Sequence, residues 1–179
     1  MFTYRVPNNG DPDALYFAEL RVQCVLANQA YDQLSAYCRT VDRRSNGRIC
    51  VGASPSNVIA QCVGFLSAVA VVSKILFPAD KNAACRGERL RKRLALGDIP
   101  EIASRSVRNA YEHIDEKIDA LRVPDADSQI WLMDTNEEAC GDPIVLKRFD
   151  PVSRTIQFLG NRLDLEACKE EIVLVERSL

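Results

Sequence analysis

An apolar segment, Val58–Phe77, constrains the fold of this chain more than any other feature of its sequence. Ala, Val and Ile dominate it, and a helix that is apolar nearly all round is buried either in a protein core or in a membrane. A membrane span needs about 20 predominantly apolar residues, but Gln61, Ser67, Ser73 and Lys74 interrupt this segment. We therefore expect it to form the central helix of a bundle, and we expect no membrane span.

Helical periodicity predicts four helices before Pro124. Ser54 and Pro55 suit the N-cap and the first position of the central helix. Apolar residues recur at helical spacing in each of the other segments, and polar, Gly-containing or Pro-containing connections separate them. The predicted helices cover about residues 11–43, 54–77, 81–96 and 100–121.

The pattern changes after Pro124. Two short runs rich in Ile, Val and Phe, residues 143–149 and 155–159, predict a β-hairpin, and residues 128–133 are a candidate third strand. An amphipathic segment at residues 165–176 predicts a terminal helix.

The predicted fold class is therefore mainly α, a four- to five-helix bundle with a small C-terminal hairpin and a terminal helix. We place the bundle at residues 11–122 and the appendage at residues 125–179, packed on the bundle.

The composition is that of an ordinary soluble globular protein, with 47% hydrophobic and 27% charged residues. The net charge of −2 gives no overall basic field, so any binding of nucleic acid would come from a local patch. The seven cysteines form no Cys-x-x-Cys pair, and we see no signal peptide. We expect them to act as small hydrophobic residues in a reducing cytoplasm. Since the chain has one histidine and its thiols lack ligand spacing, we expect no metal and no other cofactor.

The one histidine, His113, ends the sequence Arg108-Asn109-Ala110-Tyr111-Glu112-His113 on the fourth predicted helix. Histidine exchanges a proton near neutral pH, and arginine can hold a phosphate with its planar fork of donors. On a helical wheel Asn109 and His113 share one polar edge. The opposite core stripe is predicted to comprise Val107, Ala110, Tyr111, Ile114, Ile118 and Leu121. Arg108, Asn109 and His113 are thus candidates for handling a phosphodiester. The plainer alternative is a surface helix with an Arg108–Glu112 ion pair.

This motif resembles the Arg-polar-x-x-x-His signature of the HEPN domains, and the likeness covers about residues 11–122. HEPN domains are compact bundles of four or five helices with the motif on a late helix. The resemblance implies metal-independent cleavage of RNA, commonly at a homodimer interface where two motifs face each other, in stress or phage defence. It makes His113 the general base or acid at the ribose 2′-hydroxyl or the leaving oxygen. Arg108 would stabilise charge on the scissile phosphate, and Asn109 would position it.

Two features distinguish this chain from active members of that family. One branch, the toxin half of toxin–antitoxin pairs, has a tyrosine two residues after the histidine, where this chain has Asp115. Glu112, Asp115, Glu116 and Asp119 also place negative charge around the motif, which repels a phosphate backbone. Because some HEPN proteins have lost catalysis, the alternative is an inactive module that dimerises or docks a protein partner such as an antitoxin. A third alternative is an unrelated helical bundle with a chance motif.

A run of cations precedes the motif on the third predicted helix. One more arginine of the candidate set, Arg105, lies near the start of the fourth predicted helix. The candidates for contacts with an RNA backbone are Arg86, Arg89, Arg91, Lys92, Arg93 and Arg105. No aromatic residue interleaves with them, so base stacking is not indicated. The structural alternative is a solvated helix face, which is the usual fate of a charge run.

Overall fold

The computed structural model describes most of the chain between Gly10 and Leu179. The described residues are 10–40, 42–43, 49–50, 54–104, 106–119, 130–131 and 144–179. Only the backbone is described for residues 42–43, 49–50, 55, 107–108, 110, 117, 130–131 and 144–145.

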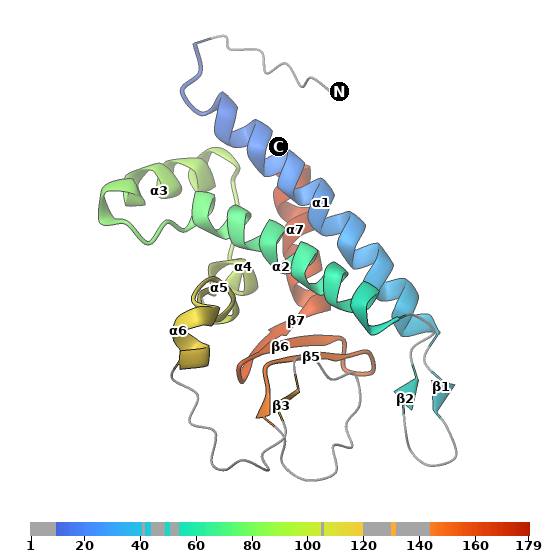
Figure 1. The fold of residues 1–179 in the computed structure, drawn as a ribbon. Coiled ribbons are helices and arrows are strands. Elements are labelled where there is room, and N and C mark those ends of the chain that lie inside the picture. Colours follow the sequence, from blue (N-terminus) through green and yellow to red (C-terminus); the bar gives the residue numbers. More distant parts are fainter. Residues whose placement is uncertain are drawn as a thin grey trace, which may run out of the picture.

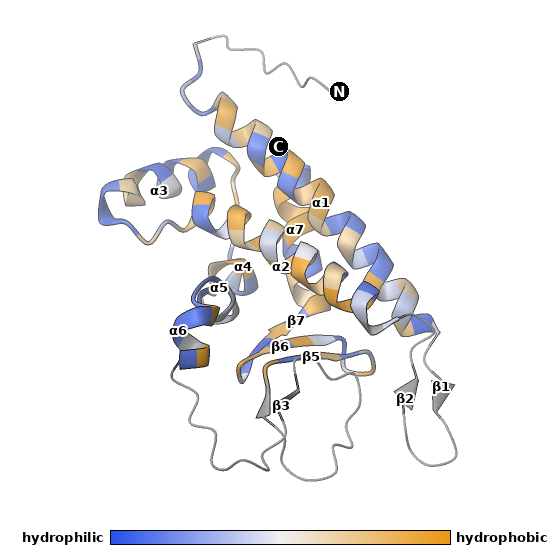
Figure 2. Ribbon diagram, viewed as in Figure 1, coloured by the Kyte–Doolittle hydropathy of each residue, from blue (hydrophilic) through white to orange (hydrophobic). Residues whose placement is uncertain are grey.

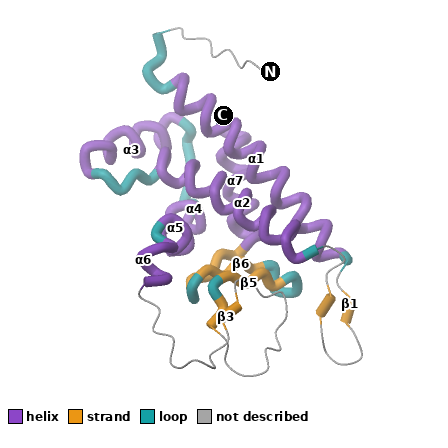
Figure 3. The backbone as a smooth tube through the Cα atoms, in the orientation of Figure 1, coloured by secondary structure: helices purple, strands orange, loops and turns teal. Residues whose placement is uncertain are grey.

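Helices dominate the fold, which confirms the predicted mainly-α class (Figure 3). The helices are α1 (Ala14–Arg39), α2 (Pro55–Leu76), the short 3-10 helix η1 (Lys81–Ala83), α3 (Ala84–Arg93), α4 (Pro100–Ala103), α5 (Ser106–Glu112), α6 (Ile114–Asp119) and α7 (Leu165–Ser178). The strands are β1 (Asp42–Arg43), β2 (Ile49–Cys50), β3 (Ile130–Trp131), β4 (Ile144–Val145), β5 (Lys147–Asp150), β6 (Thr155–Phe158) and β7 (Asn161–Asp164).

Helix α2 lies at the centre of the fold, as its apolar sequence predicts. It packs along α1 and contacts α3, α4 and α5, while α7 packs on α1 and α4 (Figure 1). The Ser54 side chain accepts a hydrogen bond from the Asn57 amide and caps the start of α2. Apolar residues run along most of α2, whereas α3 and α6 are largely hydrophilic (Figure 2). Among the described residues, one buried cluster includes Phe65 of α2, Leu20 of α1, Phe158 of β6 and Ile172 of α7.

By length and composition alone, the segment Ser56–Leu76 of α2 could cross a membrane, and no other described helix could. However, 56% of its most apolar stretch is buried inside the protein. The core helices of folded domains often have the same length and apolar composition.

The small sheet differs from its prediction in the identity of its third strand. Strands β5, β6 and β7 form an antiparallel meander, so the third strand is Asn161–Asp164, which was expected only to lead into the last helix. Leu159 and Gly160, both with positive φ, make the tight turn between β6 and β7. Residues 130–131 of the expected strand 128–133 pair instead with β4, in parallel. Strand β7 was missed because it is short and carries one apolar residue, Leu163, so no alternation marks it.

The predicted continuous helix at residues 100–121 is broken. Ser104 is extended and separates α4 from α5, and His113 forms a turn between α5 and α6. A physical reason lies in Ile102 and Tyr111, which both pack inward. Nine residues at about 100° each would put them on opposite sides of a straight helix. The predicted core stripe is also wrong at Ile118, which is 46% exposed.

The other helix bounds differ by a few residues from their predictions. Helix α1 begins at Ala14 and ends at Arg39, inside the predicted 11–43. The predicted helix 81–96 begins as the 3-10 helix η1 and ends at Arg93, and Ala95 beyond it has a positive φ of 49°.

Candidate functional site

Helix α5 carries the Arg–His motif and is held from its inner side by α2 and the sheet. The Tyr111 ring meets the Phe158 ring edge-on, with 5.7 Å between centroids. The Tyr111 hydroxyl accepts a hydrogen bond from Ser67 of α2 at 3.3 Å. Glu112 forms an ion pair with Lys74 of α2 at 2.8 Å. These contacts leave the polar edge of α5 facing solvent.

Asn109 and His113 lie one helical turn apart on that exposed edge. The His113 amide donates to the Asn109 carbonyl at 3.0 Å, so the helical hydrogen bonding continues into the turn. The His113 side chain is 54% exposed, and its Nδ1 lies 3.2 Å from Glu116 Oε1. The backbone of Arg108 belongs to α5, while its side chain lies outside the described residues.

The surroundings of His113 are acidic and open. Glu112, Asp115, Glu116 and Asp119 are all exposed. Among the described residues no group of three or more His, Cys, Asp or Glu side chains could hold a metal ion. The imidazole of His113 thus contacts the carboxylate of Glu116, one turn from the side-chain amide of Asn109. An imidazole paired with a carboxylate can accept and donate a proton.

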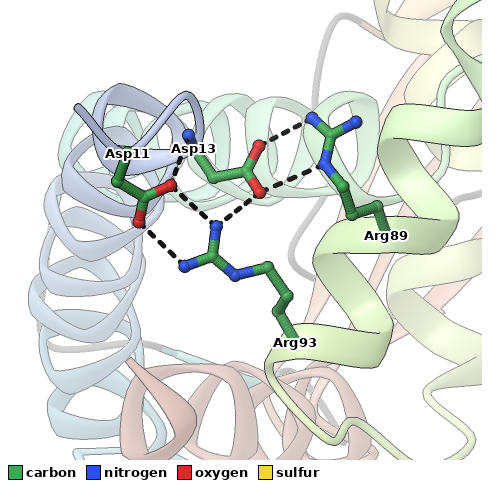
Figure 4. A network of polar contacts seen from close by, with 4 residues as sticks. All are labelled: Asp11, Asp13, Arg89 and Arg93. Carbon is green, nitrogen blue, oxygen red and sulfur yellow. Dashed lines mark hydrogen bonds and ion pairs between the residues drawn. The ribbon is translucent and has the colours of Figure 1, made fainter.

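The basic run on α3 is largely bound within the protein. Arg89 donates to Asp13 through Nη2 at 2.7 Å and Nε at 3.1 Å, and Arg93 donates to both Asp13 and Asp11. Figure 4 shows the two guanidinium groups reaching the two carboxylates at the start of α1. The Asp13 side chain is 1% exposed. These contacts join α3 to the N-terminus of α1.

Two further arginines of this run cover aromatic rings. Arg86 lies 5.0 Å from the centre of the Tyr16 ring, and Arg91 lies 4.5 Å from that of Phe77. Arg91 also donates to the Leu76 carbonyl at the end of α2. Of the six cations expected to contact RNA, Lys92 is exposed and Arg105 lies outside the described residues. The remaining four make contacts within the protein, while the side chains of Arg89 and Arg93 are still 50% and 40% exposed. The run is therefore not the purely solvated helix face of the structural alternative, and its contacts with RNA remain a prediction.

Sequence reasoning missed the acids that bind these arginines. Asp11 and Asp13 fall at the start of the first predicted helix, and no partner was expected for them, although the spacing of Arg89 and Arg93 on one side of α3 was a usable signal. Asp13 lies 76 residues before Arg89 in the sequence, and Asp11 lies 82 residues before Arg93. No local sequence pattern therefore links these acids to the arginines.

Acid is expected to weaken the junction between α1 and α3. The hydrogen bonds from Arg93 and from the Asp13 amide hold the pKa of Asp11 at about 2, below its ordinary 3.8. Hydrogen bonding to Arg89 likewise lowers the pKa of Asp13. A depressed pKa in the folded state contributes stability above the unfolded value that is lost as the pH falls through the folded value. Urea unfolding of the wild type and of Arg93→Gln should therefore give midpoints that converge between pH 4 and about pH 2. A constant difference would contradict this origin.

Three of the five described cysteine side chains fit the interpretation of the thiols as small hydrophobic residues. Cys24, Cys62 and Cys168 are buried in the core, and Cys85 is exposed. Burial raises the pKa of Cys24 to about 12 and raises that of Cys168 well above its ordinary range. The side chains of Cys50 and Cys140 lie outside the described residues.

Comparison of the chain with protein-family models, with curated proteins and with solved structures gave no match to any of them.

Proposed function

We propose that this protein is a HEPN-like ribonuclease that cleaves RNA without a metal, with His113 as the residue that transfers the proton. One observation carries the proposal. The exposed imidazole of His113 contacts the Glu116 carboxylate through Nδ1 at 3.2 Å, one turn beyond the exposed Asn109. A carboxylate at Nδ1 favours the tautomer with its proton on Nδ1, which leaves Nε2 as the proton acceptor.

The chemistry needs no cofactor because RNA carries its own nucleophile. In the proposed step Nε2 of His113 takes the proton of a ribose 2′-hydroxyl while that oxygen bonds to the neighbouring phosphorus. The bond from phosphorus to the 5′-oxygen breaks, and that oxygen takes a proton from water. The products are a 2′,3′-cyclic phosphate and a 5′-hydroxyl end. Arg108 would stabilise the negative charge that develops on the phosphate, and Asn109 would hold a phosphate oxygen.

A cleavage assay on the full chain tests this proposal. Purified wild type and His113→Ala are incubated with RNA in EDTA, and the ends of the products are identified. We expect cyclic phosphate ends from the wild type and a rate lower by about 10²-fold or more for His113→Ala, which is the usual size of a lost acid–base contribution.

Two controls sharpen the assay. A substrate with a single 2′-deoxyribose should resist cleavage at that position only. Asp98→Asn, a change at an exposed acid that lies outside the motif, should leave the rate unchanged. Equal rates for wild type and His113→Ala, or cleavage of the deoxy position, would exclude the mechanism.

The second candidate function is a catalytically inactive HEPN-like module in the cytoplasm that dimerises or docks a protein partner. The ion pairs of Arg89 and Arg93 with Asp11 and Asp13 favour it, because they remove positive charge from the surface expected to track a phosphate backbone. The acids around His113 act in the same direction. Absence of cleavage by wild-type protein, together with no measurable RNA binding at low salt, would select this function over the first.

A further inference from the structure

Helix α1 has a second apolar face that points away from the bundle. Its inner face is formed by residues such as Leu20 and Leu34, each fully buried. On the outer face Leu15 is 70% exposed, Leu26 is 46% exposed, and Val22 and Val25 are each 40% exposed. Scattered exposed apolar residues are ordinary, but a contiguous row on one helix face marks an interaction surface.

The row has the spacing of a helix–helix seam. Leu15, Val22 and Gln29 follow one another at intervals of seven residues, and Val25 and Leu26 fall between them. Val22, Val25 and Leu26 line a shallow hollow of about 320 Å³ together with Arg21 and Gln29. A hollow flanked by projecting apolar side chains suits the packing of knobs from another helix.

Charged side chains lie beside the row and not within it. Arg21 and Asp32 are 11 residues apart, and at about 100° per residue they lie within about 20° of each other, along one edge of the row. Both are exposed, and Arg21 also donates to the Leu179 carbonyl at 2.6 Å. Arg21 lies five residues before Leu26, and Asp32 lies six residues after it.

We propose that this face binds the same face of a second copy of the chain, with the two α1 helices antiparallel and crossing near Val25 and Leu26. An antiparallel pair places Arg21 of each copy beside Asp32 of the other, so that two opposite-charge contacts flank the apolar seam. A parallel pair would set this edge of one helix against the opposite edge of the other, so that Arg21 and Asp32 of the two copies could not meet across the seam. Charge complementarity therefore selects both the occupant and its direction.

This interface is independent of the proposed catalytic function. Helix α5 packs against α2 and the strands β6 and β7, on the other side of α2 from α1 (Figure 1). Copies joined through α1 would hold their His113 residues on separate surfaces, in contrast to the facing motifs that the HEPN resemblance implies. The association state and the RNA cleavage rate are different measurements, so either proposal can fail alone.

The test measures molar mass in solution by light scattering on the full chain. We expect a dimer for the wild type and at least about 30-fold weaker association for Leu26→Glu, because a charge would enter the centre of the seam. Leu174→Glu is the matched control, since Leu174 is a 50% exposed leucine on α7 outside this face, and it should remain a dimer. Circular dichroism of each variant checks that the fold is kept.

A charge exchange tests the direction of the helices. Arg21→Asp alone and Asp32→Arg alone should weaken the dimer by placing like charges together, and the double variant should restore it. A monomeric wild type would overturn the proposal in favour of another occupant of this face. A dimer that survives Leu26→Glu, or that is lost on substituting Asn109 or His113, would overturn it in favour of a different interface.

Discussion

Replacing Gly87 with alanine is expected to destabilise the folded protein by about 2 kcal/mol or more. A Cβ at this position would lie 2.5 Å from Pro78 Cδ and 2.7 Å from the Leu76 carbonyl oxygen. Both neighbours belong to the end of α2 and the turn that follows, and a proline ring and a backbone carbonyl cannot rotate away. Helix α3 would have to move off α2, which also disturbs the contacts of Arg91 with Leu76 and Phe77.

Gly64→Ala provides the matched control because Gly64 also lies within a helix. A Cβ there would meet only the Cβ of Ala30 at 3.9 Å, an ordinary contact. Helix propensity then stabilises the alanine variant by about 0.5–1 kcal/mol. Urea unfolding followed by circular dichroism should move the two midpoints in opposite directions. A stabilised Gly87→Ala variant would show that α3 does not approach the end of α2 this closely.

Replacing Glu171 with alanine is expected to cost about 2–4 kcal/mol, because one buried and one partly buried backbone donor would lose their acceptor. Glu171 lies on α7 and is 7% exposed. Its carboxylate accepts hydrogen bonds from the Glu101 amide at 3.0 Å and the Ile102 amide at 2.7 Å. It thereby caps α4, whose N-cap residue Ile99 makes no side-chain hydrogen bond of its own. This cap sets the start of the segment that leads to α5.

The neighbouring Glu170 is exposed on the same helix, so Glu170→Ala should change the unfolding midpoint little and serves as the control. Glu171→Gln should fall between the two, because an amide keeps one acceptor oxygen but turns an NH₂ group towards the other donor. An unfolding midpoint of Glu171→Ala equal to that of Glu170→Ala would contradict the capping role.

The pH dependence of Glu171 has the opposite sign to that of Asp11 and Asp13. Burial raises the pKa of Glu171 above its ordinary 4.5, and the two backbone hydrogen bonds offset this only in part. A raised pKa of an acid in the folded state favours its protonated form, so its contribution to stability is lost as the pH rises through the folded value. Urea unfolding at a series of pH values tests this. The stability of the wild type relative to Glu171→Gln should increase as the pH falls from above the raised pKa of Glu171 towards 4.5.

Local signals in the sequence predicted the main helices well. The apolar run, Ser54 and Pro55 placed α2 to within a residue or two of its observed bounds. These local signals succeed because helix periodicity and capping depend on residues only a few positions apart. The position of Asn109 and His113 on one exposed edge follows from the same periodicity.

Contacts between distant segments were beyond these signals. The break at Ser104, the capping of α4 by Glu171 and the pairing of Arg89 with Asp13 each depend on a partner far along the chain. The helical wheel treated residues 100–121 as a straight rod, and it therefore placed Ile118 wrongly in the core.

By itself the sequence determined a mainly helical protein around one apolar helix and singled out the motif that ends at His113. Only the tertiary structure decided which of the charged side chains have partners within the protein. The arginines of α3 look like a free basic face in the sequence, yet Asp11, Asp13, Tyr16 and Phe77 occupy four of them. The reason is physical: periodicity shows which side of a helix is polar, whereas electrostatic partners are set by the packing that brings remote residues within a few ångströms.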